Sequence, residues 1–127
     1  MRQVWVVDDD EEMSEAIGLM LNVLDCEVTS FHSARSAAQK LLTAKAPDLL
    51  ILDINLPEVS GLDLLEFLRR RPEWKELPIV MFSSEAADST VDKALQLGAD
   101  AYLMKPATIE ELKKVMESSI HKHGNLK

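Results

Sequence analysis

The chain has 127 residues, a formal net charge of −8 at pH 7 and a single cysteine. This length suits one compact domain, and the acidic balance disfavours direct nucleic-acid binding, which usually shows a basic patch. One cysteine excludes an intrachain disulfide framework, no apolar run approaches a membrane span, and the N-terminus turns acidic after Val7, so we expect a cytoplasmic protein without membrane contact.

The first half of the chain alternates strand and helix patterns. Residues 4–7 form an apolar run that ends in acidic residues, and apolar side chains at helical spacing follow. Residues 26–31 alternate between apolar and polar, which is typical of a half-exposed edge strand, and Ser33 is placed to cap a second helix. Four apolar residues, 49–52, then predict a strand buried on both faces.

The second half repeats this alternation. A third helix ends before Pro72, and residues 79–82 predict a fourth strand. The fourth helix ends at Gly98, because glycine tolerates the left-handed backbone of a helix C-terminus. A fifth strand contains residues 102–103, and the T-x-x-E sequence at 108–111 predicts a capping box for a last helix.

Five strands that alternate with five helices predict an α/β fold, in which right-handed crossovers cover both faces of a doubly wound parallel sheet. We expect one domain over residues 1–121 and a polar, frayed tail over residues 122–127.

Acidic side chains follow two of the predicted strands. Asp8 and Asp9 come after the first strand and Asp53 after the third, and the carboxyl ends of parallel strands open on the same edge of a sheet. Three close carboxylates without Cys or His favour Mg²⁺, which engages phosphate oxygens. Two further strand ends supply the hydroxyl of Ser83 and the positive charge of Lys105, so the pattern predicts phosphoryl chemistry.

Four segments carry a resemblance to a known family: VVDD at 6–9, LDINLPEVSG at 52–61, FSSEA at 82–86 and GADAYLMKPA at 98–107. Together they span essentially the whole chain, and the sequence resembles the receiver domains of two-component response regulators. The resemblance implies a flavodoxin-like (βα)5 fold with strand order 2-1-3-4-5. The sequence departs from the common pattern at Ala107, where many members carry Phe, and at Ser84, where Ala is frequent.

The resemblance also implies a role for each candidate site residue. These roles are Asp53 as phospho-acceptor, Asp9 as direct Mg²⁺ ligand, Asp8 as ligand through water, Asn55 as a backbone carbonyl ligand, Lys105 as phosphoryl contact, Ser83 as switch hydroxyl and Tyr102 as switch aromatic. The implied phosphoryl donor is a histidine kinase or a phosphotransfer protein. The domain is then a signalling component that catalyses only its own phosphorylation and dephosphorylation.

The resemblance places the output on the face formed by the fourth helix, the fifth strand and the last helix, toward a downstream protein or output domain. Family members that dimerise through this face use charged residues where this chain has Ala101 and Val115. We therefore expect a monomer, or a dimer of another geometry, and no direct contact with nucleic acid.

Two other functions fit parts of the pattern. A magnesium-dependent phosphohydrolase with an aspartyl nucleophile, of the haloacid dehalogenase type, uses a D-x-D motif, but the second position here is Asn55. A nucleotide-binding module is disfavoured because neither glycine-rich phosphate motif occurs.

Three further features have simpler interpretations. The acidic run at 8–12 contains a helix start, where negative charge is favourable in any case. The basic cluster 69–71 fits cations at a helix end. His121 and His123 form an H-x-H pair near the chain end without further ligands, which favours solvated side chains over a metal site.

Overall fold

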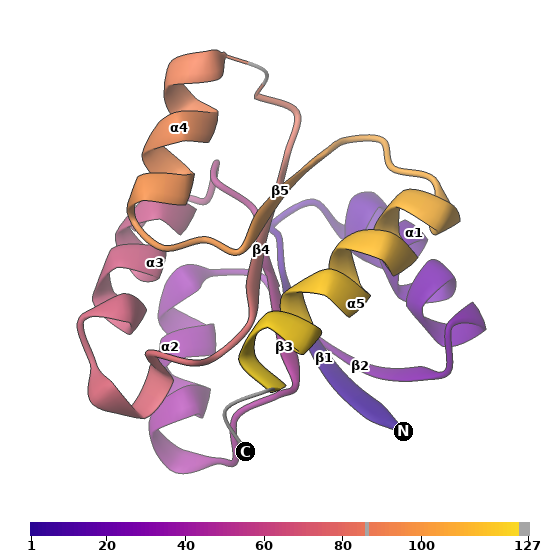
Figure 1. The fold of residues 1–127 in the computed structure, drawn as a ribbon, viewed down its shortest axis with the longest axis horizontal. Coiled ribbons are helices and arrows are strands. Elements are labelled where there is room, and N and C mark those ends of the chain that lie inside the picture. Colours follow the sequence, from indigo (N-terminus) through magenta and orange to yellow (C-terminus); the bar gives the residue numbers. More distant parts are fainter. Residues whose placement is uncertain (86, 125–127) are drawn as a thin grey trace.

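The computed structural model describes residues 1–85 and 87–124, and it consists of a parallel five-stranded sheet between two layers of helices (Figure 1). The strands are β1 (Arg2–Val7), β2 (Cys26–Phe31), β3 (Leu49–Leu52), β4 (Ile79–Ser83) and β5 (Ala101–Met104). The helices are α1 (Glu11–Val23), α2 (Ala34–Thr43), α3 (Gly61–Arg69), α4 (Asp88–Gln96) and α5 (Ile109–Gly124), with a 3-10 turn at Pro72–Trp74. The strand order is β2-β1-β3-β4-β5, which confirms the expected fold.

Alternation along the strands divides the core into two layers. Trp5 and Val7 of β1 face one layer with buried residues of α2 and α3, whereas Val4 and Val6 face the other with α1 and α5. Figure 1 shows the same division, with α2, α3 and α4 on one side of the sheet and α1 and α5 on the other. Because successive side chains of a strand point to opposite faces, both layers cover the central strands.

The predicted positions of the strands agree with their burial. All four residues of β3 are buried, because β3 pairs with β1 and β4 and is covered on both faces. By contrast, β2 pairs only with β1 and exposes about half of its residues, as the alternating sequence predicts.

Side-chain caps fix the starts of the helices. Asp10 accepts a hydrogen bond from the amide of Met13, and Ser33 caps α2 as predicted. At the start of α5, Thr108 and Glu111 each accept the other's backbone N–H, at 2.9 and 3.1 Å, which confirms the capping box. Four of the orphan N–H donors of these helix starts are thereby satisfied.

The predicted frayed tail over residues 122–127 is helical as far as the structure describes it, which corrects that expectation for its first residues. The last helix continues to Gly124, while residues 125–127 of the predicted tail lie outside the described residues. The interpretation of His123 as a solvated side chain is also wrong. Its two ring nitrogens lie 2.8 Å from Glu76 Oε1 and 2.8 Å from Asp100 Oδ1, and its side chain is only 15% exposed.

Arg69 does more than complement the dipole of α3. Its guanidinium donates to Asp100 Oδ2 at 3.2 Å, to the Gly98 carbonyl at 2.8 Å and to the Trp74 carbonyl at 2.9 Å. Gly98 has the predicted left-handed backbone, with φ of 111°. These bonds connect α3 to the loops before β4 and β5, at the amino-terminal edge of the sheet.

Among the described residues, no helix combines the length and apolar character needed to cross a membrane.

Candidate functional site

The sheet brings the predicted acidic residues together. Val7 pairs with Leu52 in the register of β1 and β3, so Asp8 and Asp53 follow at the same carboxyl edge. The backbone N–H of Asp53 donates to the Val7 carbonyl at 2.9 Å, which fixes the two strand ends relative to each other. The expectation that these carboxylates meet in space is confirmed.

Asp8, Asp9 and Asp53 form a set of oxygen donors suited to a hard cation. One carboxylate oxygen from each residue lies within 4.8 Å of the others. Asp8 and Asp53 are buried and Asp9 is exposed, so the set is open to solvent on one side. Oxygen donors without nitrogen or sulfur are what Mg²⁺ prefers, and an open side leaves room for its waters and for phosphate oxygens.

Lys105 places its charge between two of these carboxylates. Its Nζ lies 2.7 Å from Asp8 Oδ2 and 3.2 Å from Asp53 Oδ2. The sequence predicts a lysine that meets phosphate, but it does not predict the shorter bond to Asp8. In this arrangement Lys105 is the counter-ion of the acidic pair, and its side chain is only 12% exposed.

Burial and charge shift the pKa values of both partners. Burial raises the pKa of Asp53 above its usual range, Asp8 adds to the effect, and the charge of Lys105 opposes it. For Lys105, burial favours the neutral amine, but the bonds and charges of Asp8 and Asp53 outweigh it, so the pKa of Lys105 is raised. The site therefore holds a charged lysine beside a carboxylate that is costly to keep ionised.

Two neighbouring backbone amides orient the carboxylates. The N–H of Asn55 donates to Asp53 Oδ1 at 3.2 Å, and the N–H of Asp10 donates to Asp8 Oδ1 at 3.0 Å. Asp10 itself caps α1, in agreement with a helix-start role for the acidic residues that follow Asp9. A metal contact from the Asn55 carbonyl stays a prediction.

The two predicted switch residues lie beside the same edge. Ser83 is fully buried at the end of β4, and its Oγ accepts the N–H of Glu85 at 3.1 Å. The hydroxyl of Tyr102 donates to the carbonyl of Glu85 at 2.8 Å. Both side chains thus hold the loop after β4, of which Ala86 lies outside the described residues. The backbone N–H of Lys105 also donates to the Ser83 carbonyl at 3.0 Å.

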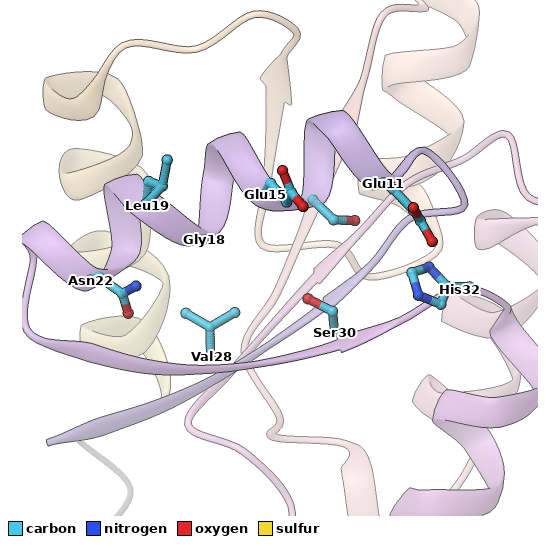
Figure 2. Close-up of a pocket in the computed structure, with 9 residues that line it drawn as sticks. Glu11, Glu15, Gly18, Leu19, Asn22, Val28, Ser30 and His32 are labelled. Atoms are coloured by element: carbon cyan, nitrogen blue, oxygen red, sulfur yellow. The ribbon is translucent and has the colours of Figure 1, made fainter.

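A hollow of about 500 Å³ lies elsewhere, between α1 and β2. Figure 2 shows Glu15 and Leu19 of α1 above Val28 and Ser30 of β2, with His32 at one end. None of the seven predicted site residues lines this hollow. The acidic site is thus distinct from it, and a phosphoryl group is small enough to react at an open strand edge.

Sequence reasoning missed one residue that touches the site. Gly61 belongs to the LPEVSG segment, but the sequence gives it no role in the site. Its backbone N–H donates to the Ile54 carbonyl at 2.9 Å, and its Cα lies against the main chain of Asp53. Only the three-dimensional approach of α3 to β3 reveals this contact.

Comparison with known proteins agrees with this site. The model of the response regulator receiver domain family matches residues 4–117. The chain is 36% identical over 116 residues to the chemotaxis protein CheY1 of Helicobacter pylori, which covers 91% of this chain and 94% of that protein. It is 38% identical over 110 residues to the phosphate regulon transcriptional regulatory protein PhoB of Rhizobium meliloti, covering 87% of this chain and 48% of that protein. A high-resolution structure of the chemotaxis response regulator CheY4 of Vibrio cholerae has a TM-score of 0.85 at 27% identity, covering 94% of this chain and 98% of that one.

A buried strand-end carboxylate, an acidic edge and a lysine on a sheet of this order are the features of a phosphorylation-controlled signalling domain. The chain belongs to the response regulator receiver domain family, the phosphorylation-controlled switches of two-component systems. It spans 17% to 48% of the length of three curated relatives.

Proposed function

We propose that Asp53 of this receiver domain takes a phosphoryl group from the phosphohistidine of a histidine kinase or phosphotransfer protein. The observation that carries the proposal is the position of Asp53, a buried strand-end carboxylate within 3.2 Å of Lys105 and within 4.8 Å of the Asp8 and Asp9 carboxylates. An oxygen of Asp53 attacks phosphorus, the phosphorus–nitrogen bond breaks, and its electron pair leaves with the imidazole. Water later hydrolyses the acyl phosphate and restores the carboxylate.

The chain's own groups fit this transfer. Asp8, Asp9, Asp53 and the Asn55 carbonyl would hold Mg²⁺, which neutralises charge on the phosphoryl oxygens when it is bound. We assign Asp9 as the direct ligand and Asp8 as a ligand through water, because Asp8 already bonds Lys105 and the Asp10 amide. Lys105 would then follow the developing negative charge on the phosphoryl group.

We further propose that Ser83 and Tyr102 transmit the modification. Both contact Glu85 in the loop before α4, so a phosphoryl group that attracts the Ser83 hydroxyl would disturb the bonds at Glu85. Such a change shifts a population between two packings and requires no new fold. The Ser83→Ala variant should accept phosphate but alter α4 less in NMR spectra on beryllofluoride binding; equal shifts would contradict this role.

The proposed output surface is the face of α4, β5 and α5, with a protein as its partner. Leu95 of α4 is 45% exposed and Met104 of β5 is 38% exposed, so the face offers apolar contact area. Glu111 is engaged in the capping box of α5. We propose a cytoplasmic domain that is a monomer, or a dimer of another geometry. Sedimentation with and without beryllofluoride tests it, and an activation-dependent dimer broken by Lys93→Glu would contradict it.

The acceptor assignment is tested by labelling. Intact-mass spectrometry after incubation with acetyl phosphate and Mg²⁺ should show one phosphoryl addition on the wild type and none on Asp53→Asn. The matched control is Asp10→Asn, which changes an exposed carboxylate of the same acidic run and should label like the wild type. Undiminished labelling of Asp53→Asn would refute the assignment, and sustained turnover of a chromogenic phosphate ester would favour the phosphohydrolase.

A further inference from the structure

Gly61 begins α3 at a point where the helix touches the backbone of the acceptor strand. A Cβ built on Gly61 would lie 1.9 Å from the carbonyl oxygen of Asp53 and 2.8 Å from its carbonyl carbon. It would also lie 2.9 Å from the Cα of Ile54. Real Cβ atoms essentially never come within 3.0 Å of such neighbours, so any side chain here must displace one of the two backbones.

Both backbones are firmly held. On the strand side, the Asp53 N–H donates to the Val7 carbonyl at 2.9 Å, and β3 lies between two paired strands. On the helix side, Ser60 caps α3, and the buried Leu64 and Leu65 anchor it to the core. Packed interiors yield little, so the surrounding core does not absorb this clash. The two backbones must instead move apart by roughly 1 Å at the contact itself, where Asp53 leaves the strand.

We propose that Gly61 is a positioning residue for Asp53: its missing side chain lets α3 hold the acceptor carboxylate at its distance from Lys105 and from the acidic pair. The inference rests on the proposed function, because it concerns the rate at which Asp53 takes a phosphoryl group. A side chain at position 61 moves the Asp53 backbone, and the carboxylate with it, out of line with Lys105, Asp8 and Asp9. Displacements of about 1 Å at a reacting group cost on the order of 100-fold in rate.

The chain contains a matched control for the same substitution. Gly18 also lies in a helix, but a Cβ built there meets nothing within 4 Å. An alanine at position 18 therefore adds the same methyl group without a contact. Gly98 is unsuitable as a control, because its φ of +111° strains any other residue.

The test measures the initial rate of Asp53 labelling by acetyl phosphate at saturating Mg²⁺ in Gly61→Ala, Gly18→Ala and wild-type protein. We expect a loss of about 100-fold for Gly61→Ala and no change for Gly18→Ala. Amide NMR signals of Asp53 and Asn55 should move in Gly61→Ala alone. A third variant, Leu68→Ala, removes a buried side chain at the other end of the same helix and should label at the wild-type rate while it is folded.

Each outcome decides the matter. If Gly61→Ala folds and labels like the wild type, the inference is wrong. If it is unfolded, trimethylamine N-oxide is added to restore folding before the rate is measured. If it stays unfolded there, or if Leu68→Ala loses rate equally, the contact serves the fold and not the site. Labelling of Asp53→Asn would instead contradict the proposed function itself. This result distinguishes failure of the acceptor assignment from failure of the inference about Gly61.

Discussion

The carboxylates at the two edges of the sheet differ in how fully they are paired with cations and hydrogen-bond donors. At the carboxyl edge, three aspartates lie around one lysine: Lys105 pairs with Asp8 and Asp53, and Asp9 has no ion pair among the described residues. At the amino edge, the single carboxylate of Asp100 accepts from Arg69 and from the Ile79 amide and lies 3.6 Å from Lys122 Nζ. The ring of His123 completes this second cluster, so Asp100 has partners on both of its oxygens.

This difference separates a reactive site from a structural one. Carboxylates with too few cationic partners are stabilised when they bind a metal ion or lose their charge. The carboxyl edge is therefore suited to chemistry. A buried carboxylate with all of its bonds made has nothing further to bind and instead ties α3, β4 and α5 together.

Removing the lone cation should affect chemistry most. Lys105→Met deletes the group that meets the developing charge, and we expect the labelling rate with acetyl phosphate to fall by about 100- to 1,000-fold. Lys40→Met, on an exposed turn of α2, is the control and should label normally. A Lys105→Met protein that labels at the wild-type rate would show that the lysine is only a counter-ion.

Breaking the amino edge should affect stability and leave chemistry unchanged. In the Arg69–Asp100 pair the side chains are 12% and 3% exposed, and removing one partner of a buried pair costs about 3 kcal/mol or more. Urea unfolding of Arg69→Met measures this loss. The control is Arg70→Met, whose side chain is 77% exposed and whose pair with Glu66 is worth at most about 1 kcal/mol. A fall in the labelling rate of folded Arg69→Met would contradict the separation.

The raised pKa of Asp53 predicts an unusual pH dependence. The folded chain binds this proton more readily than the unfolded chain, so the free energy of unfolding falls as pH rises from the ordinary value of 3.8 through the folded pKa. The Asp53→Asn variant has no titrating carboxyl at this position, so its free energy of unfolding does not fall in this way. Without Mg²⁺, its stability relative to wild type should therefore grow with pH across that window, by at most about 1.4 kcal/mol per pH unit. Urea titrations between these limits test it, with exposed Asp63→Asn as control; a constant difference would contradict the pKa shift.

The smallest effect concerns the end of α5. His123→Gln disturbs the contacts of the ring with Glu76 and Asp100, and hydrogen bonds of this kind contribute about 1 kcal/mol each. His121→Gln changes an exposed neighbour on the same turn and should cost almost nothing. Equal unfolding midpoints for the two variants would show that the amino edge does not depend on the histidine.

The sequence predicts the elements well because their signals are local. The β3 strand is a run of four apolar residues, and its predicted bounds of 49–52 agree with the structure. The meeting of Asp8 with Asp53 follows from the topology of parallel sheets, which needs no knowledge of side-chain packing. The capping box at Thr108 is equally local, since all of its partners lie within three residues.

Contacts between distant loops carry no such signal. Arg69 and Asp100 are 31 positions apart, and His123 meets Glu76 across 47 positions, so periodicity cannot pair them. The bond of Lys105 to Asp8 and the close approach of Gly61 are also set by how elements dock. Sequence patterns show which face of an element is buried, but they do not show which polar groups meet at its ends.

Asp53, the proposed acceptor, lies at the end of β3, which is paired on both sides, and this has a consequence for hydrogen exchange. Amides in such a strand exchange only when the whole domain opens, whereas loops and edge strands exchange through small local openings. The amides of β3 should be among the slowest in the chain, and those around Glu85 and Tyr102 much faster. The surface proposed to meet a partner can then open locally while the strand that carries the proposed acceptor stays closed.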